Sequence, residues 1–456
     1  MSMSVVIYLP DNTGHQFDIP NGNYTTTSQY LQLMIATLKL PDSLAKKSFA
    51  LWLKSPLLDV QLKPQHVPFR MVKQWPMLLE KYSMATDYEK AQDEPALIFR
   101  RNAFLTKEDE VQITNEAILN ILMMEAKSCI QQGIYPCDTE DIEQLGALLC
   151  LGKDEEHKQD EDKHGMESVV KENLPTLVPS HMARAKRSFL NRQQSMEERV
   201  MVCLKKASKE SSINCTLEFM KICWQLPYYG SVIFSGFVEK ASHSTFSLWF
   251  SSQTQMCVLI AINTNGVWVI DKEKKHVLIG LLYDDFNWEM TTPEPNEDGL
   301  NADTELQLPS LFLEFDDEKT KTNQLLQIVS KQAPMMDSMI ETCILMIREK
   351  EQIAQAQNMA SSGDESNGLK SKANAITSAS TTRVRPLFER QNSVTSSHPE
   401  KLILTKMSDS DESSQSNPSS PIDLEHTQKP GKRKIFKKVA GRQKGFSHSE
   451  EHHELL

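Results

Sequence analysis

The sequence predicts an α+β protein with three folded lobes followed by a disordered tail. Apolar residues alternate as in short strands over about the first hundred residues, recur with a helical period between 108 and 227, and alternate again between 230 and 350. Beyond residue 351, Ser, Asp, Asn and Gln dominate, and such a segment cannot bury enough surface to offset its chain entropy. A length of 456 residues also suits about three domains.

The first lobe, residues 4–104, is predicted to be a small mixed sheet crossed by a helix. Ser28 is the expected N-cap of that helix. The residues expected on its apolar face are Leu31, Met34, Ile35 and Leu38. A second, shorter helix is expected at 75–82. Strands are expected at 5–9, 15–19, 49–53, 57–62 and 96–99. This order of elements is that of a ubiquitin-like fold.

The second lobe, residues 108–227, is predicted to be a bundle of four helices interrupted by an acidic, solvated loop over 152–170. Asp138 is the expected N-cap of the second helix, and Ser195 that of the third, because Ser195-Met196-Glu197-Glu198 has the pattern of a capping box. The apolar positions of the first two helices are Ile118, Ile121, Leu122 and Cys129, then Ile142, Leu145, Leu148 and Leu149.

The third lobe, residues 230–350, is predicted to contain seven antiparallel strands closed by one helix. Asn265-Gly266 lies between apolar runs and is a strong hairpin signal. Pro334 is expected to open the amphipathic helix. The strands are expected at 232–238, 246–250, 256–262, 267–270, 277–283, 311–315 and 325–329. Seven strands and a C-terminal helix are typical of a PH- or PTB-like sandwich.

Composition and motifs argue against several functional classes. A net charge of −11 is unsuited to coating nucleic acid. No nucleotide-binding, nucleophile-elbow or metalloprotease motif occurs. His448 and His452 fit a zinc pattern, but they lie in a polar stretch with no apolar face to hold a helix. The sequence therefore predicts a non-enzymatic, cytosolic protein with no cofactor, no metal and no nucleic-acid partner.

Three segments of the sequence resemble segments that are typical of one known family. Residues 134–138 read Ile-Tyr-Pro-Cys-Asp and lead into Leu-Gly-Ala-Leu-Leu at 145–149. Residues 225–230 resemble the junction between bundle and sandwich, and residues 262–270 resemble the hairpin of the third lobe. With the three lobes in this order, the chain resembles the FERM family from about residue 5 to 347. The resemblance implies a ubiquitin-like lobe, an acyl-CoA-binding-protein-like bundle and a PH/PTB-like lobe.

The resemblance also implies a function. The expected protein is a cytoplasmic adaptor, recruited to the cytoplasmic face of the plasma membrane, that binds the cytoplasmic tail of a transmembrane protein. The implied partners are inactive rhomboid proteins (iRhoms), which support the sheddase that releases tumour necrosis factor, and a Wnt co-receptor. The alternative is a membrane–cytoskeleton linker that binds phosphoinositides. Such a linker needs a helical filament-binding end, and residues 352–456 show no helical periodicity.

The expected binding site is a groove on the third lobe, where an extended peptide adds to a strand edge beside the C-terminal helix. The strand at 277–283 is the expected edge and the helix at 336–347 the expected wall. The groove residues are Val277, Ile279, Leu281, Met336, Met339, Ile340 and Cys343. The simpler interpretation of the helix positions is that most of them cover the sandwich core.

The tail, residues 351–456, carries two further features. A basic cluster at 429–444 has three interpretations: weak contact with anionic lipid, a nuclear-import signal, or a solvated tail. Its central residues are Lys432, Arg433, Lys434, Lys437 and Lys438. The serines in kinase-like contexts are Ser393, Ser408, Ser410 and Ser420.

Overall fold

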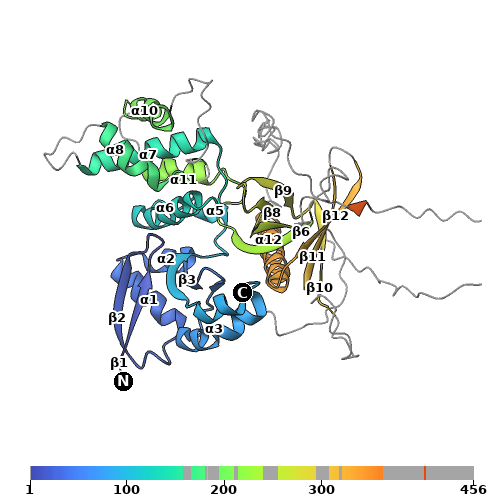
Figure 1. Ribbon diagram of the computed structural model, residues 1–456. Coiled ribbons are helices and arrows are strands. Elements are labelled where there is room, and N and C mark those ends of the chain that lie inside the picture. The colour runs from blue at the N-terminus through green and yellow to red at the C-terminus, as the bar shows by residue number, and fades with distance from the viewer. Residues whose placement is uncertain are drawn as a thin grey trace, which may run out of the picture.

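The computed structural model describes residues 2–157, 166–179, 182, 195–209, 214–239, 255–293, 308–317, 321–362 and 405–406. These residues form three lobes in the predicted order: a mixed sheet with helices, a helical bundle, and a sandwich closed by a helix (Figure 1). One hydrophobic core runs through all three lobes, and a smaller one lies within the bundle. The lobes therefore pack together rather than standing apart.

The first lobe is a five-stranded sheet in the order β2-β1-β5-β3-β4. Only β1 and β5 are parallel, with Ile7 opposite Leu97, as in a ubiquitin-like fold. The strands are β1 (Ser2–Tyr8), β2 (Gly14–Pro20), β3 (Phe49–Lys54), β4 (Asp59–Gln61) and β5 (Ala96–Arg101). The helices are α1 (Thr27–Thr37), α2 (Asp42–Ser48), α3 (Pro68–Tyr82) and α4 (Asp87–Gln92).

Two predictions for this lobe were wrong in detail. Thr26, not Ser28, caps α1, and the Gln29 side chain accepts a hydrogen bond from the Thr26 N–H at 2.8 Å. Helix α3 begins at Pro68 rather than at residue 75, because proline is well suited to the first turn of a helix. Pro76 lies inside this helix without ending it.

The bundle confirms the predicted caps. Asp138 Oδ1 accepts from the Asp141 N–H at 2.9 Å, and Ser195 Oγ accepts from the Glu198 N–H at 3.2 Å. Its elements are α5 (Lys107–Glu110), α6 (Glu116–Gln131), α7 (Thr139–His157), α8 (Met166–Asn173), the 3₁₀ turn η1 (Leu174–Thr176), α10 (Met196–Ala207) and α11 (Cys215–Cys223).

The prediction of an acidic loop over 152–170 was wrong at both ends. Helix α7 continues to His157, and α8 begins at Met166. Val169 and Val170 of α8 are buried in the smaller core, where burial of their side chains favours the helix over a solvated loop. Residues 158–165 lie outside the described part of the chain.

The third lobe is an antiparallel sheet in the order β10-β11-β12-β6-β7-β8-β9. Its elements are β6 (Val232–Glu239), β7 (Gln255–Asn263), β8 (Gly266–Asp271), β9 (Val277–Leu282), β10 (Phe286–Thr291), β11 (Ser310–Asp316), β12 (Asn323–Val329), α12 (Ala333–Ser362) and β13 (Thr405–Lys406). The strand expected at 246–250 lies outside the described residues, and β10 was not predicted.

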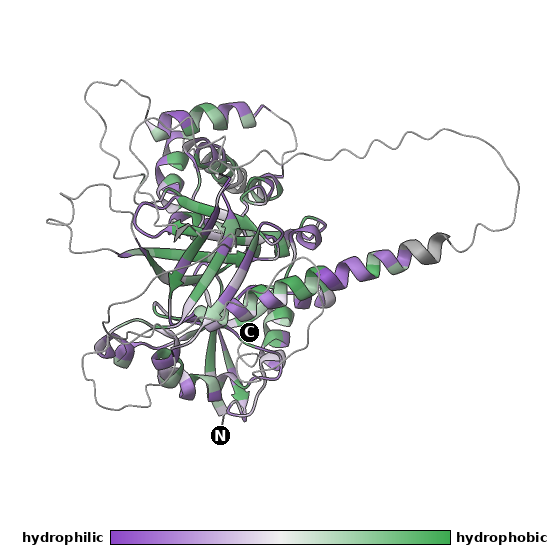
Figure 2. Ribbon diagram, turned by 90° about the vertical axis from the view of Figure 1, so that its right-hand side faces the viewer, coloured by the Kyte–Doolittle hydropathy of each residue, from purple (hydrophilic) through white to green (hydrophobic). Residues whose placement is uncertain are grey.

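The predicted start of the tail at residue 351 was also wrong. Helix α12 runs on to Ser362, and Figure 2 shows its later turns standing clear of the lobes. Ile353 on this projecting part is 58% exposed. Within the expected tail, Thr405 and Lys406 pair as β13 with β12.

Candidate partner-binding surface and lobe junction

The three lobes meet around the end of β5. Arg101, the last residue of β5, is only 7% exposed. Its Nε donates to Glu110 Oε2 at 2.7 Å, its Nη2 to Leu105 O at 2.6 Å, and its Nη1 to Gly230 O at 3.2 Å. Burial would by itself lower the pKa of Arg101, but the Glu110 carboxylate more than offsets this, and the pKa is raised. The guanidinium therefore stays charged.

Glu110 completes this link on the bundle side. Its side chain is fully buried. Oε1 accepts from Tyr229 Oη at 2.6 Å and from Trp224 Nε1 at 2.8 Å, while Oε2 accepts from Arg101. A buried carboxylate is tolerated only when it is paired and hydrogen-bonded, and Glu110 meets both conditions. One side chain thus joins the first lobe, the bundle and the chain that enters the sandwich.

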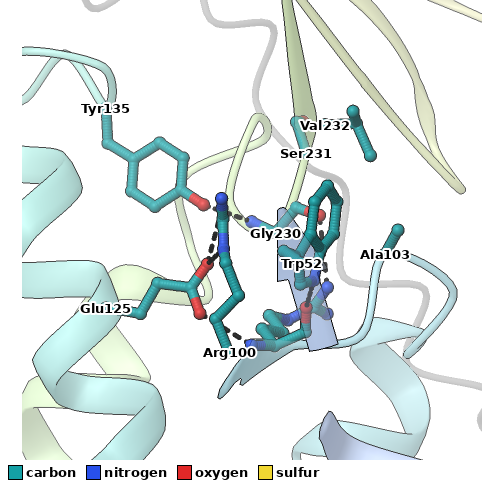
Figure 3. A pocket seen from close by; sticks show the side chains of 9 residues that line it. Trp52, Arg100, Ala103, Glu125, Tyr135, Gly230, Ser231 and Val232 are labelled. Carbon is teal, nitrogen blue, oxygen red and sulfur yellow. Dashed lines mark hydrogen bonds and ion pairs between the residues drawn. The ribbon is translucent and has the colours of Figure 1, made fainter. Parts of the chain in front are cut away.

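Arg100 forms a second link, on the other side of β5, because successive side chains of a strand point to opposite faces. Arg100 and Glu125 of α6 face each other in Figure 3, with Nε donating to Oε1 at 2.9 Å. Glu125 Oε2 also accepts from the Arg101 N–H at 2.7 Å. Nearby, Tyr135 Oη accepts from the Gly230 N–H at 3.0 Å. Both arginines therefore tie β5 to the other lobes.

A cavity of only about 10 Å³ lies among these groups, which is room for about one water molecule. Ligand pockets usually measure about 300–1,000 Å³. Among the residues that line the cavity, Arg100 bonds to Glu125 and Tyr135 bonds to Gly230 (Figure 3). Ser231 Oγ, also buried there, has no hydrogen-bond partner among the described residues. Among the residues that the structure describes, no group of three or more His, Cys, Asp or Glu side chains is placed to hold a metal ion. The junction is therefore a structural link between lobes.

The expected groove is not open in the structure. Met336, Met339, Ile340 and Cys343 of α12 are all fully buried. They cover the sandwich core, as the simpler interpretation proposed, and cannot line a surface groove. On β9, Ile279 and Leu281 are buried and Val277 is half-buried.

Helix α12 lies beside strand β10, not beside β9. β9 does lie at one edge of the sheet, but α12 packs against β7, β10 and β11. Trp288 Nε1 of β10 donates to Asp337 Oδ1 of α12 at 2.8 Å. β10 is the other edge strand in the described sheet, so the helix flanks this edge. The signal that could have revealed β10 is the apolar alternation of Phe286, Trp288 and Met290 after a two-aspartate turn.

The other sequence-predicted residues fall outside the described part of the chain. These are the basic-cluster residues Lys432, Arg433, Lys434, Lys437 and Lys438, and the serines Ser393, Ser408, Ser410 and Ser420. Lipid contact and phosphorylation at these positions stay predictions.

Comparison with known proteins agrees with the architecture. The family described as FERM central domain matches residues 108–234, and the family described as KRIT1/FRMD8, FERM domain C-lobe, matches residues 256–339. Both matches fall on the lobes described above, and together with the ubiquitin-like first lobe they define a FERM module. The chain belongs to the FERM family.

Its relatives include proteins named FERM domain-containing protein 8. The chain is 36% identical over 367 residues to the one from Xenopus laevis, with 77% of each chain covered. It is 35% identical over 414 residues to the one from Homo sapiens, with 86% of this chain and 82% of the human protein covered.

One similar solved structure is the human myosin 7b C-terminal MyTH4-FERM domain in complex with the harmonin-a PDZ3 domain. That likeness has a TM-score of 0.48 and 16% identity, and it covers 76% of this chain and 60% of the solved chain. Within the described part of the present chain, no helix is both long and apolar enough to cross a membrane.

Proposed function

We propose that the protein is a non-enzymatic adaptor whose third lobe binds an extended cytoplasmic segment of a membrane protein. FERM proteins are generally adaptors that bind other proteins. The observation that supports the site is the edge strand β10 with α12 beside it, joined by the hydrogen bond from Trp288 to Asp337. The proposed site is therefore the β10 edge, whereas the sequence had led us to expect the β9 edge.

Strand addition explains why this edge suits an extended peptide. β10 pairs with β11 along its whole length, from Phe286 opposite Phe315 to Thr291 opposite Ser310. The backbone groups on its other side point away from β11, and this is the side on which β-augmentation would add a strand. Asn287 and Glu289 alternate with the buried Trp288 and are half-buried, so they lie where side chains of the peptide can reach them.

The proposed partner is the cytoplasmic N-terminal tail of an iRhom. Support comes from the relatives named FERM domain-containing protein 8 and from the resemblance discussed above. Binding would hold the iRhom at the cell surface and support release of tumour necrosis factor, with negative regulation of Wnt signalling at the co-receptor as a further role. The basic cluster would add weak contact with anionic lipid at the cytoplasmic face of the plasma membrane.

Hydrogen exchange can locate the site, because an added strand slows exchange of the amides it pairs with. Deuterium uptake of the full chain is measured with and without the iRhom cytoplasmic tail. We expect slower uptake at Phe286–Thr291, while Val277–Leu282 stays unchanged and serves as the internal comparison. Slowing confined to Val277–Leu282 would return the site to β9, and binding without slowing at either edge would refute strand addition.

A further inference from the structure

Helix α3 of the first lobe turns one face to the core and the other to solvent. Trp75 and Leu79 are fully buried, and Trp75 Nε1 donates to Asp93 Oδ2 at 2.9 Å. On the opposite side of the helix, Met77 is 62% exposed and Phe69 is half-buried. The buried contacts therefore fix the orientation of α3, and its outer face is a preformed surface.

Apolar and basic side chains alternate along this outer face. One ridge of the helix is formed, at four-residue spacing, by Phe69, Lys73, Met77 and Lys81. Lys73 Nζ lies over the Phe69 ring, 4.4 Å from its centroid. Arg70 is exposed beside this ridge. We call these five residues the α3 face.

The three cations of the α3 face lack a negative partner. Within the described part of the chain, Arg70, Lys73 and Lys81 form no ion pair, and each lies over an aromatic ring instead. The single carboxylate in the sequence of α3, that of Glu80, is already paired, because Lys90 Nζ lies 2.7 Å from its Oε2. The α3 face therefore has a positive charge that a negatively charged partner can neutralise.

The neighbouring helix α4 determines which kind of negative partner fits. Lys90 Nζ contacts Asp87 Oδ1 at 3.3 Å as well as Glu80, so Asp87 lies beside the C-terminal half of α3. The side chain of Asp87 is 97% exposed, and Glu89 on the same helix is also exposed. A flat anionic membrane laid on α3 would meet these carboxylates, and like charges repel. A narrow protein segment can follow the ridge and leave them in water.

We propose that the α3 face is a protein-docking surface and that its occupant is an acidic amphipathic helix of a partner protein. The carboxylates of this helix pair with Arg70, Lys73 and Lys81, and its aliphatic side chains pack on Phe69 and Met77. Methionine suits such a surface because its unbranched, flexible side chain adapts to different apolar partners.

This surface is separate from the proposed peptide site on the third lobe. The α3 face belongs to the first lobe, whereas the β10 edge belongs to the sheet of the third. The proposal therefore does not rest on strand addition at β10, and the two sites can be tested independently.

The test measures, by fluorescence anisotropy, how the full chain binds a labelled probe peptide. The probe has the length of α3, 15 residues, and its Glu and Leu residues lie on opposite flanks of one helix face. Lys73→Glu/Lys81→Glu should weaken binding about tenfold. The matched control Lys205→Glu/Lys206→Glu makes the same charge change at exposed positions of α10 and should alter the affinity less than about twofold. Equal losses in the two variants, or no binding by the unchanged chain, would overturn the proposal.

Two further arms address the apolar contact and the membrane alternative. Met77→Ser keeps every charge and should weaken probe binding about threefold, because it removes apolar contact area; an unchanged affinity would overturn the amphipathic occupant. Vesicles of phosphatidylserine and phosphatidylcholine test for lipid. Vesicle binding that is lost in Lys73→Glu/Lys81→Glu while probe binding is kept would assign the α3 face to a membrane and contradict the proposal.

A scrambled probe of the same composition, in which Glu and Leu no longer segregate, separates docking from general charge attraction. It should bind at least about tenfold more weakly than the amphipathic probe, because its carboxylates and aliphatic side chains cannot reach the α3 face together. Equal affinity of the two peptides would overturn the proposal. Melting transitions of all variants check that the exposed substitutions leave the fold intact.

Discussion

The guanidinium of Arg101 and the carboxylate of Glu110 meet at 2.7 Å, with 7% and 0% of their side chains exposed. This pair joins the sheet of the first lobe to the start of the bundle. Through Tyr229 and Gly230 it also holds the chain that leads into the sandwich. These buried polar contacts therefore fix the relative positions of the lobes together with the hydrophobic core that runs through all three.

Replacing Glu110 by Gln should lower the free energy of unfolding by about 3–5 kcal/mol, because Arg101 would stay charged and buried without its partner. Glu108→Gln is the matched control, since Glu108 is 68% exposed and meets Lys350 only at the surface, 3.6 Å away. That change should cost no more than about 1 kcal/mol. Denaturant unfolding measures both, and equal small losses would contradict the role given to Glu110.

Gly230→Ala should destabilise the protein by about 2 kcal/mol or more. Gly230 has φ of +71°, and a Cβ there would lie 2.6 Å from Arg101 Cζ. Gly152→Ala in α7 is the control, because its Cβ would meet only Cys215 Cβ at 3.6 Å. In a helix this change should raise stability by about 0.5–1 kcal/mol. Thermal melting of both variants checks the opposite signs, and a neutral Gly230→Ala would be inconsistent with the described junction.

Met339→Glu should unfold or severely destabilise the third lobe, by more than about 3 kcal/mol, because Met339 is fully buried and an unpaired carboxylate there has no partner. Leu345→Glu introduces the same carboxylate on the same helix at a position that is 46% exposed. It should alter stability by no more than about 0.5 kcal/mol. Circular dichroism melts compare the two. If Met339→Glu were tolerated, Met339 would face a groove, as first expected from the sequence.

The free energy of unfolding should fall as the pH becomes alkaline. Burial raises the pKa of Cys343 from 9.0 to about 12, and that of Cys129 from 9.0 to about 11. Because the folded pKa lies above the unfolded one, this contribution to stability is complete below pH 9 and is lost as pH rises towards 11–12. The denaturant midpoint should fall across this window.

The alkaline effect has a specific control. Cys343→Ala should reduce the slope of stability against pH above pH 9. Cys257→Ala removes an exposed thiol and should leave the slope as it is. The same slope in all three proteins would show that the buried Cys343 thiol does not contribute.

Much of the fold could be predicted because local signals agree with the tertiary structure. The caps Asp138 and Ser195, and the hairpin at Asn265-Gly266, specify their own elements through short-range chemistry. Helix α8 was missed because its charged sequence resembles a loop, whereas the packing of Met166, Val169 and Val170 against the neighbouring helices stabilises it.

The site was harder to predict than the fold. Met336 and Met339 have the spacing of a helix face, but the sequence cannot say which strands that face covers. The contact of Trp288 with Asp337, which identifies the flanked edge, joins residues far apart in the chain. The network around Glu110 likewise depends on partners from three lobes, and no local pattern specifies it.

The most direct test of the adaptor function is a calorimetric titration of the purified full chain with the cytoplasmic N-terminal tail of an iRhom. We expect saturable one-to-one binding with a negative heat-capacity change, since docking on the third lobe buries apolar surface. A scrambled peptide of the same composition should not bind. If the protein is shown to be folded by its melting transition and the native tail gives no saturable binding, the proposed function is contradicted.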